Sequence, residues 1–184
     1  MKRKRIRFAK VLSECNDRLD TLAPEDRVSS YLSPYLHAAM SSTETLPPQL
    51  AKIVERFKRR SNPKQKYEQL LWYAKKLPQM PESGKIEENK VKGCVSQVYI
   101  TASLEDGKIH YQGDSDAQLV KGLVGFLIEG LNDLTPEEII QIEPNFIEDT
   151  GLKVSLTPSR ANGFFNIFQM MKKKALGFHL ATEQ

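Results

Sequence analysis

Residues 95–131 read VSQVYITASLEDGKIHYQGDSDAQLVKGLVGFLIEGL and contain the clearest strand, turn and helix patterns of the chain. In the stretch Val91 to Ile100, β-branched and aromatic residues with polar alternation at Val95, Gln97 and Tyr99 predict a β-strand. The sequence Glu105-Asp106-Gly107 is a turn signal, and Lys108 to Tyr111 is the predicted returning strand of a hairpin. We therefore predict a small antiparallel β-sheet of about three strands.

A helix is predicted directly after this hairpin. The sequence Gly113-Asp114-Ser115-Asp116 closes the hairpin, and an Asp or Ser there can cap the free backbone N–H groups of the helix. Apolar residues then recur at helical spacing at Val120, Leu123, Val124, Leu127, Ile128 and Leu131. We expect this helix to be the central one.

Two helices are predicted before the sheet. The first begins near Pro47 or Pro48 and ends before Ser61, and its apolar stripe is Leu50, Ile53, Val54 and Phe57. Asn62-Pro63 is typical of an N-cap followed by proline at the first helical position. The apolar stripe of the second helix is Tyr67, Leu70, Leu71, Ala74 and Leu77. Pro78 and Pro81 end this helix.

Two further helices are predicted after the central one. Thr135-Pro136-Glu137-Glu138 is a capping box that starts a short helix through Ile142. Thr157-Pro158 opens the last helix, whose stripe is Phe164, Phe168, Met171, Ala175 and Phe178. Helices on one face of a small antiparallel sheet make an α+β domain.

The positive charge of the chain is concentrated at its N-terminus. The 184 residues carry a net charge of +4, and residues 1–39 contain eight basic and five acidic side chains, a local charge of +3. This placement argues against a basic nucleic-acid-binding face. The region lacks the apolar run of a signal peptide or membrane helix, and its carboxylates argue against a transit peptide.

The composition predicts one folded domain after this basic region, because 40% of the residues are hydrophobic and 27% charged. We predict a poorly structured basic extension over residues 1–45 and a domain over residues 46–184. Met40 precedes small polar residues just before the first helix, so we hypothesise that it is an alternative translation start.

The chain has 2 Cys and 3 His, with no CxxC or HxxxH spacing, so neither a disulfide framework nor a metal site is expected. Cys94 follows Gly93 between a polar loop and the first strand, where glycine allows a bent tip that presents a thiol. The residues alone also allow Cys94 to be a buried small hydrophobe. Cys15 is interpreted as an incidental thiol of the extension.

The sequence offers poor candidates for a base that would activate Cys94. His37 lies in the extension, His179 lies near the C-terminus, and His110 lies in the second strand. Without a base, the thiol could be deprotonated by nearby cations, Lys92 or Arg160, or could receive a sulfur that another enzyme has already activated. The last option makes the chain a sulfur acceptor.

Three sequence blocks resemble the signature blocks of the SufE family in order and spacing. They are VKGCVSQV at residues 91–98, GDSD at 113–116 followed by VKGL at 120–123, and LTPSR at 156–160 followed by Asn162-Gly163. The resemblance covers about residues 46–178. Two departures are visible: many bacterial members carry Gln after the cysteine and Trp where Tyr99 stands, so partner preference is not carried over from them.

The resemblance implies a SufE-like α+β fold and a sulfur carrier that is not itself an enzyme. It would stimulate a SufS-like cysteine desulfurase, take sulfane sulfur as a persulfide on Cys94, and pass it to a SufBCD-type scaffold for iron–sulfur cluster assembly. The pyridoxal phosphate (PLP) belongs to the desulfurase, so this chain is expected to bind no cofactor or metal. The implied location is a bacterial cytoplasm, for example cyanobacterial, in preference to a plastid stroma; a homodimer is left open.

The resemblance also implies roles in the cysteine loop or in partner docking for Gly93, Val95, Ser96, Gln97, Asp114, Asp116, Lys121, Arg160, Asn162 and Gly163. Arg160 would engage the partner, although it can also be read as a surface arginine at a helix start. Asp116 is either a restraint on the loop or a helix cap. A persulfide is reactive, so we expect an apolar hollow around Cys94, lined by Val95 and by aromatic or aliphatic residues of the central and last helices.

Two rival functions follow from the residues. One is an enzyme that uses Cys94 as a nucleophile, a thiol hydrolase or peroxidase, which would need a base such as His110. The other is a module that binds nucleic acid through the basic extension, whose affinity would fall steeply with salt. The sulfur-carrier hypothesis predicts no nucleic-acid partner and no membrane partner.

Overall fold

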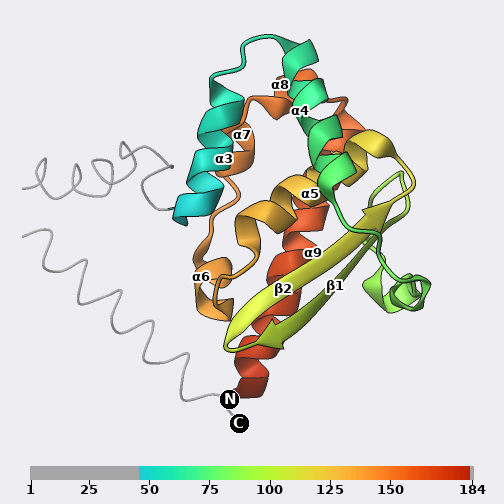
Figure 1. The fold of residues 1–184 in the computed structure, drawn as a ribbon, viewed down its shortest axis with the longest axis vertical. Helices are drawn as coiled ribbons and strands as arrows, with labels where there is room; N and C mark the ends of the chain where they lie inside the picture. The colour runs from blue at the N-terminus through green and yellow to red at the C-terminus, as the bar shows by residue number, and fades with distance from the viewer. Residues whose placement is uncertain (1–45, 183–184) are drawn as a thin grey trace, which may run out of the picture. The chain divides into compact units, whose positions relative to one another are not determined.

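A computed structural model describes residues 46–182 of the chain (Figure 1). The longer elements are α3 (Pro48–Lys58), α4 (Pro63–Lys76), β1 (Val98–Glu105), β2 (Lys108–Ser115), α5 (Gln118–Leu131) and α9 (Pro158–Thr182). The short elements are η1 (Glu82–Gly84), η2 (Glu87–Asn89), α6 (Pro136–Gln141), α7 (Phe146–Asp149) and α8 (Leu152–Ser155). The predicted extension, Met40, Cys15 and His37 lie outside the described residues.

The sheet is a β1–β2 hairpin, so the α+β class and the antiparallel pairing are confirmed. The turn residues Asp106 and Gly107 have φ angles of 51° and 77°, as the tight two-residue turn of a hairpin requires. The described residues form two strands and not the expected three. On the β1 edge only Lys90 pairs, with Tyr99, because η2 ends just before it and a turn at Lys92 and Gly93 follows it.

The bounds of both strands differ from the sequence prediction. β1 begins at Val98 and not at Val95, because residues 91–97 form a loop. Val95 is 88% exposed, so its alternation with polar neighbours does not mark a sheet face. β2 continues through Ser115, so the residues expected to close the hairpin extend it instead.

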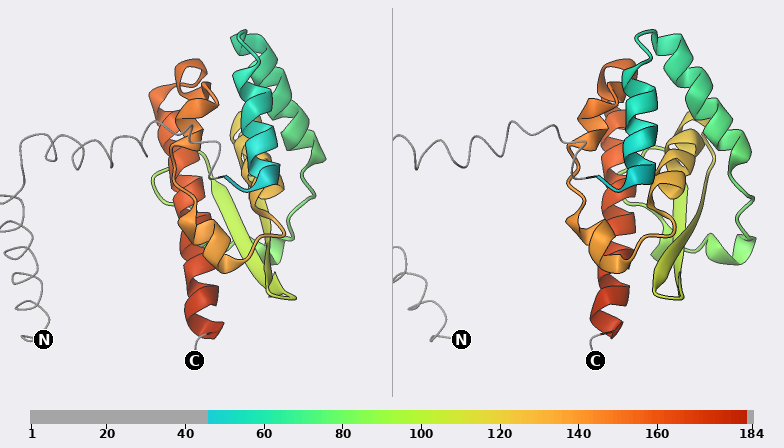
Figure 2. Two further views of the ribbon diagram at one scale, coloured as in Figure 1. Left: turned by 90° about the vertical axis from the view of Figure 1, so that its left-hand side faces the viewer. Right: turned by 60° about the vertical axis from the view of Figure 1, so that its left-hand side comes forward.

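One face of the hairpin packs against two helices, α5 and α9 (Figure 2). A Cβ on Gly113 of β2 would lie 2.8 Å from Val124 of α5, and the Tyr111 hydroxyl of β2 donates to the Met171 carbonyl of α9 (2.7 Å). Part of the other face is covered by the segment before β1, since a Cβ on Gly84 would meet Thr101. The helices therefore share one face of the sheet, as predicted.

The helix α5 is the centre of the core, as expected. Ten of its fourteen residues are buried, and it approaches α4 with glycines. A Cβ on Gly122 would lie 2.3 Å from the Leu70 carbonyl oxygen, and one on Gly125 would lie 2.9 Å from that of Tyr73. The two helices therefore touch backbone to backbone, and this contact turns Tyr73 inward.

The orientation of α4 differs in one position from the predicted stripe. Tyr73 is 1% exposed and Leu71 is 39% exposed, so Tyr73 takes the inward place that the periodicity assigned to Leu71. The predicted caps at Asn62 and Thr135 are confirmed, including both halves of the capping box.

Three further differences concern the helices around α5 and α9. No side chain caps α5, whose N-cap is Ala117, so the predicted Asp or Ser cap is wrong. The helix predicted through Ile142 ends at Gln141. The helices α7 and α8 were not predicted, because each has four residues, too few to show a helical periodicity. None of the helices in residues 46–182 is long and apolar enough to cross a membrane.

The Tyr111 hydroxyl predicts a measurable response of stability to alkaline pH. Burial raises the pKa of Tyr111 above its ordinary value of 10.0. The stability that this group contributes is therefore complete below pH 10 and is lost as the pH rises toward the folded-state pKa. Tyr111→Phe should lower the free energy of unfolding by about 0.5–1.5 kcal/mol at pH 7. Above pH 10 the difference between the free energies of unfolding of the wild type and the variant should shrink, because the wild type loses this contribution.

Urea unfolding at several pH values measures this difference. Tyr99→Phe is the matched control, because the Tyr99 hydroxyl bonds only the exposed Gln97 side chain among the contacts described. A gap between Tyr111→Phe and the wild type that stays constant from pH 7 to pH 11 contradicts the prediction.

Candidate functional site

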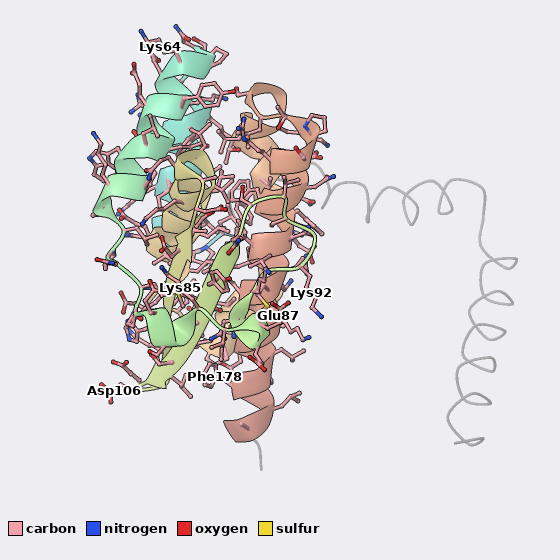
Figure 3. The ribbon with its side chains drawn as sticks, turned by 90° about the vertical axis from the view of Figure 1, so that its right-hand side faces the viewer. Lys64, Lys85, Glu87, Lys92, Asp106 and Phe178 are labelled. Carbon is pink, nitrogen blue, oxygen red and sulfur yellow. The ribbon has the colours of Figure 1, made fainter. Side chains whose placement is uncertain are left out.

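The site is built on the loop of residues 91–97, which precedes β1. The backbone N–H of Val91 donates to the Val98 carbonyl (2.8 Å) and closes the base of the loop. Gly93 has a φ of 77°, a left-handed conformation that favours glycine, and it turns the chain immediately before Cys94. Figure 3 shows Lys92 on this loop, at the end of the hairpin opposite Asp106.

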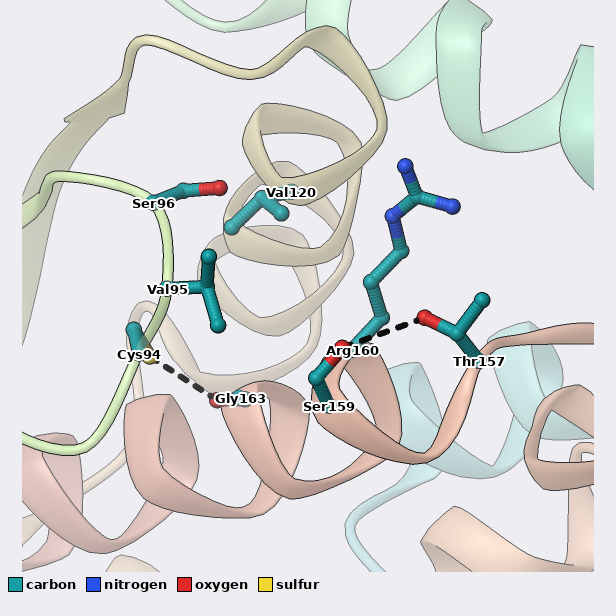
Figure 4. A pocket seen from close by; sticks show the side chains of 8 residues that line it. All are labelled: Cys94, Val95, Ser96, Val120, Thr157, Ser159, Arg160 and Gly163. Carbon is teal, nitrogen blue, oxygen red and sulfur yellow. Dashed lines mark hydrogen bonds between the residues drawn. The ribbon is translucent and has the colours of Figure 1, made fainter.

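The Cys94 side chain turns inward from this loop to α9. Its residue is only partly exposed, and the thiol donates to the Gly163 carbonyl at an S–O distance of 3.6 Å (Figure 4). A Cβ on Gly163 would lie 3.4 Å from the sulfur, an ordinary van der Waals contact, so the thiol packs directly against this position of the helix. Cys94 is therefore neither a fully buried hydrophobe nor a free surface thiol.

A cavity of about 180 Å³ adjoins the thiol, between the loop, α5 and α9 (Figure 4). It is lined by Cys94, Val95, Ser96, Val120, Thr157, Ser159, Arg160 and Gly163. The expected apolar hollow is therefore wrong in part, since only valines supply its apolar side chains. The aromatic residues of α9 do not line it, because Phe164 and Phe168 are fully buried in the core.

The C-terminal end of the loop, at Gln97, is held by Asp116. Its Oδ1 accepts from the backbone N–H of Gln97 (3.0 Å), and its own N–H donates to the Gln97 carbonyl (3.3 Å). Asp116 does not cap α5, whose N-cap is Ala117. Asp116 is therefore a restraint on the loop and not a helix cap.

Six of the implied site residues do not line the cavity. Gly93, Gln97 and Asp116 form or hold the loop, whereas Asp114, Lys121 and Asn162 make other contacts. Asp114 forms ion pairs with Lys121 (2.7 Å) and with Lys85 (3.1 Å), which join β2 to α5 and to the segment before β1. Burial alone would raise the pKa of Asp114, but the hydrogen bonds from both lysines outweigh it and lower this pKa. Asn162 lines a different hollow on α9, together with Phe165.

Sequence reasoning missed Asn166, which also contacts the loop. Its Nδ2 donates to the Gly93 carbonyl (3.0 Å). Asn166 lies beyond the last of the three sequence blocks, and a polar side chain one helical turn after Gly163 was the only signal of its role.

The surroundings of Cys94 keep its thiol protonated. Burial raises the pKa of the Cys94 thiol above its ordinary value of 9.0. The guanidinium of Arg160 extends away from the sulfur (Figure 4), and Lys92 is exposed. Activation of the thiol by these two cations is therefore not supported in this conformation.

The histidines of the described residues do not serve Cys94 either. His110 pairs across the hairpin with Ser103, and its Nδ1 lies 3.5 Å from the Asp133 Oδ1. The His179 Nδ1 lies 2.6 Å from the Glu137 Oε1. Neither histidine lines the cavity. Within residues 46–182, no group of three or more His, Cys, Asp or Glu could hold a metal ion.

The raised pKa predicts slow alkylation of native Cys94. A thiol whose pKa lies above 9.0 has little thiolate at pH 8, so iodoacetamide should react more slowly with the native chain than with the chain unfolded in guanidinium chloride. Peptide mapping by mass spectrometry follows Cys94 separately from Cys15. Equal rates for the native and unfolded chain at pH 8 contradict this prediction.

Comparisons with known proteins agree with the sequence blocks. Residues 51–175 match the family model described as "SufE: Fe-S metabolism associated domain". A SufE-like protein of Synechocystis sp. is 73% identical over 136 residues, which cover 74% of this chain and 86% of that protein. SufE-like protein 1, chloroplastic/mitochondrial, of Arabidopsis thaliana is 42% identical over 164 residues, 89% of this chain and 44% of that protein.

A parasite protein and a solved structure extend this comparison. The cysteine desulfuration protein SufE of Plasmodium falciparum is 41% identical over 133 residues, 69% of this chain and 53% of that protein. This chain therefore spans about half the length of the plant and parasite relatives. A solution structure of a hypothetical protein from Thermus thermophilus matches with a TM-score of 0.63 and 28% identity, over 72% of this chain and 96% of that one.

The family model covers all three sequence blocks, the loop that carries Cys94 and the helix that receives its thiol. The chain therefore belongs to the SufE family, whose domain is associated with iron–sulfur metabolism.

Proposed function

We propose that this chain accepts sulfane sulfur from a PLP-dependent cysteine desulfurase of the SufS type and holds it as a persulfide on Cys94. The sulfur then passes to a SufBCD-type scaffold for iron–sulfur cluster assembly. The observation that carries the proposal is the Cys94 thiol on a short loop, turned to the Gly163 carbonyl beside a cavity. The chain is a carrier that stimulates its partner, and the PLP stays on the desulfurase.

The proposed transfer is a thiol–persulfide exchange that needs no oxidant. The Cys94 thiolate attacks the outer sulfur of a persulfide on the desulfurase cysteine, and a new S–S bond forms on Cys94. The S–S bond of the donor breaks, and the desulfurase cysteine leaves as a thiolate. That thiolate takes up the proton that Cys94 released, so atoms, electrons and charge balance.

The inward position of Cys94 fits the state before and after this exchange. A protonated thiol that donates to a carbonyl is a poor nucleophile, so the loop has to turn outward before the attack. The cavity of about 180 Å³ offers room for the added sulfur once the loop has closed again. A persulfide held there is shielded from other thiols and from oxidants.

Two exposed side chains near the cavity are suited to contact the desulfurase. Val95 is 88% exposed although it is apolar, and it directly follows Cys94. Arg160 is exposed at the start of α9 and lines the same cavity. An apolar contact and a cation beside one cavity would hold the partner where the loop opens.

Sulfur transfer to the isolated chain tests the proposal. The full chain is incubated with a SufS-type desulfurase and cysteine, and intact mass is measured without reductant. We expect one added sulfur atom, assigned to Cys94 by peptide mapping, and none when cysteine is omitted. A chain that gains no sulfur while the desulfurase turns over contradicts the proposal.

We further propose that the chain acts in a bacterial cytoplasm. The similarity to a protein of Synechocystis supports a cyanobacterial setting, whereas the plant relative is named as chloroplastic or mitochondrial. Fractionation of a cyanobacterial cell that expresses the tagged chain would test this location.

A further inference from the structure

One side chain of α9 holds the peptide group that precedes the reactive cysteine. The Asn166 Nδ2 donates to the Gly93 carbonyl (3.0 Å). This carbonyl belongs to the same planar peptide unit as the backbone nitrogen of Cys94. The hydrogen bond therefore fixes the plane from which the Cys94 side chain projects.

Gly93 permits this contact in two ways. Its φ of 77° is a conformation that residues with a side chain rarely adopt. A Cβ built on it would lie 2.7 Å from the Asn166 Nδ2, so any larger residue would push the amide away. The left-handed turn and the close approach of Asn166 thus depend on the same glycine.

The two contacts of the loop with α9 lie on neighbouring positions of the helix. Asn166 follows Gly163 by three residues, so both face the same side. Gly163 receives the thiol at 3.6 Å, whereas Asn166 donates at 3.0 Å, within the usual range of an N–H···O bond. A thiol is a weak donor, so the amide bond is the stronger of the two contacts.

We propose that Asn166 is a positioning residue that keeps Cys94 turned to α9, and that its bond to the Gly93 carbonyl breaks whenever the thiol is exposed. The inference deepens the proposed function, because the exposed thiol is the one that would accept sulfur. Asn166 also lines an open groove of about 610 Å³ with Lys92 and Lys173, so its amide can exchange the Gly93 carbonyl for water or for a partner's acceptor.

Alkylation of Cys94 in the isolated full chain measures this exposure. Asn166→Ala removes the donor, and its rate should rise about threefold to tenfold, as expected for the loss of one net hydrogen bond. Asn166→Asp replaces the donor by a carboxylate that repels the Gly93 carbonyl, so its rate should rise at least as much. Alanine is a strong helix former, which keeps α9 intact if the Asp variant folds poorly.

Two matched variants separate positioning from a general effect on the helix. Gln169→Glu makes the same change from amide to carboxylate on an exposed residue one turn further along α9, and its rate should equal that of the wild type. Asn166→Gln keeps an amide donor and should recover part of the slow rate. Thermal unfolding midpoints should be similar in all folded variants.

A clear pattern of rates would overturn the inference. If Asn166→Ala is folded and alkylates at the wild-type rate, the amide does not hold the thiol. The same conclusion follows if Gln169→Glu accelerates alkylation as much as Asn166→Asp. These rates need no desulfurase, so they decide the role of Asn166 even if Cys94 fails to accept sulfur, and sulfur acceptance is decided separately by intact mass.

Discussion

We expect Cys94→Ala to lose sulfur acceptance completely and to keep both the fold and the binding of the desulfurase. The variant removes the atom that forms the new S–S bond, and no other thiol lies in the described residues. The cost to stability should be small, roughly 1 kcal/mol or less, because the thiol is only partly buried and makes one long hydrogen bond. Intact mass after incubation with desulfurase and cysteine measures the loss.

The chain offers a matched control for this variant. Cys15→Ala removes the other of the 2 cysteines and should accept one sulfur atom like the wild type. Cys94→Ser keeps a donor toward the Gly163 carbonyl but lacks the sulfur, so it should bind the desulfurase and accept nothing. Calorimetric titration with the desulfurase measures binding. Sulfur added to Cys94→Ala but absent from Cys15→Ala would contradict the proposal, because Cys15 would then be the sulfur acceptor.

Phe126→Ala should cause the largest loss of stability among single changes in α5. The Phe126 ring is fully buried and lies between those of Phe57 (5.3 Å between centroids) and Phe164 (5.4 Å), with both pairs edge to face. Truncation leaves a cavity where three helices meet, and buried Phe→Ala changes cost about 3–5 kcal/mol. Urea unfolding followed by far-UV circular dichroism measures the difference.

Phe165→Ala is the matched control, since it deletes the same side chain from α9 at a position that is 42% exposed. It should cost less than about 1.5 kcal/mol, because 42% of its surface is already exposed to water and only the remainder loses contacts. Equal destabilisation by the two variants would mean that the aromatic cluster around Phe126 is not the core of the domain.

Local signals predicted the elements that depend on neighbouring residues. The hairpin turn requires positive φ angles at Asp106 and Gly107, and the capping box needs only Thr135 and Glu138, so both could be found within a few residues of sequence. The inward position of Tyr73 in α4 could not be found in this way, because the glycines of α5 fix which side of α4 faces the core.

The start of β1 shows the limit of periodicity most clearly. Val95, Gln97 and Tyr99 alternate like a strand, but only Tyr99 lies in one. The bond between Val91 and Val98 closes the loop, α9 contacts its middle at Gly93 and Cys94, and Asp116 holds Gln97. Contacts distant in sequence therefore override the local preference.

The candidate site was predictable where it coincided with contiguous blocks. Residues 93–96, Arg160 and Gly163 come together at the cavity or directly beside it. Asp114 and Lys121 belong to the same blocks but form an ion pair elsewhere, so a shared motif did not imply a shared site. Asn166 was missed because its partner is a backbone carbonyl, so its only sequence signal was a polar side chain one helical turn after Gly163.

The edges of the two-stranded sheet constrain how copies of this domain could associate. An unpaired strand edge is a template for pairing with another chain. Here a single bridge from Lys90 occupies part of the β1 edge, and one from Leu134 occupies part of the β2 edge. Each bridge lies near one end of its strand, so an added strand could pair only with the part of the edge that is left. Among the described residues, a larger sheet made from two hairpins would therefore have a shortened ladder at either edge.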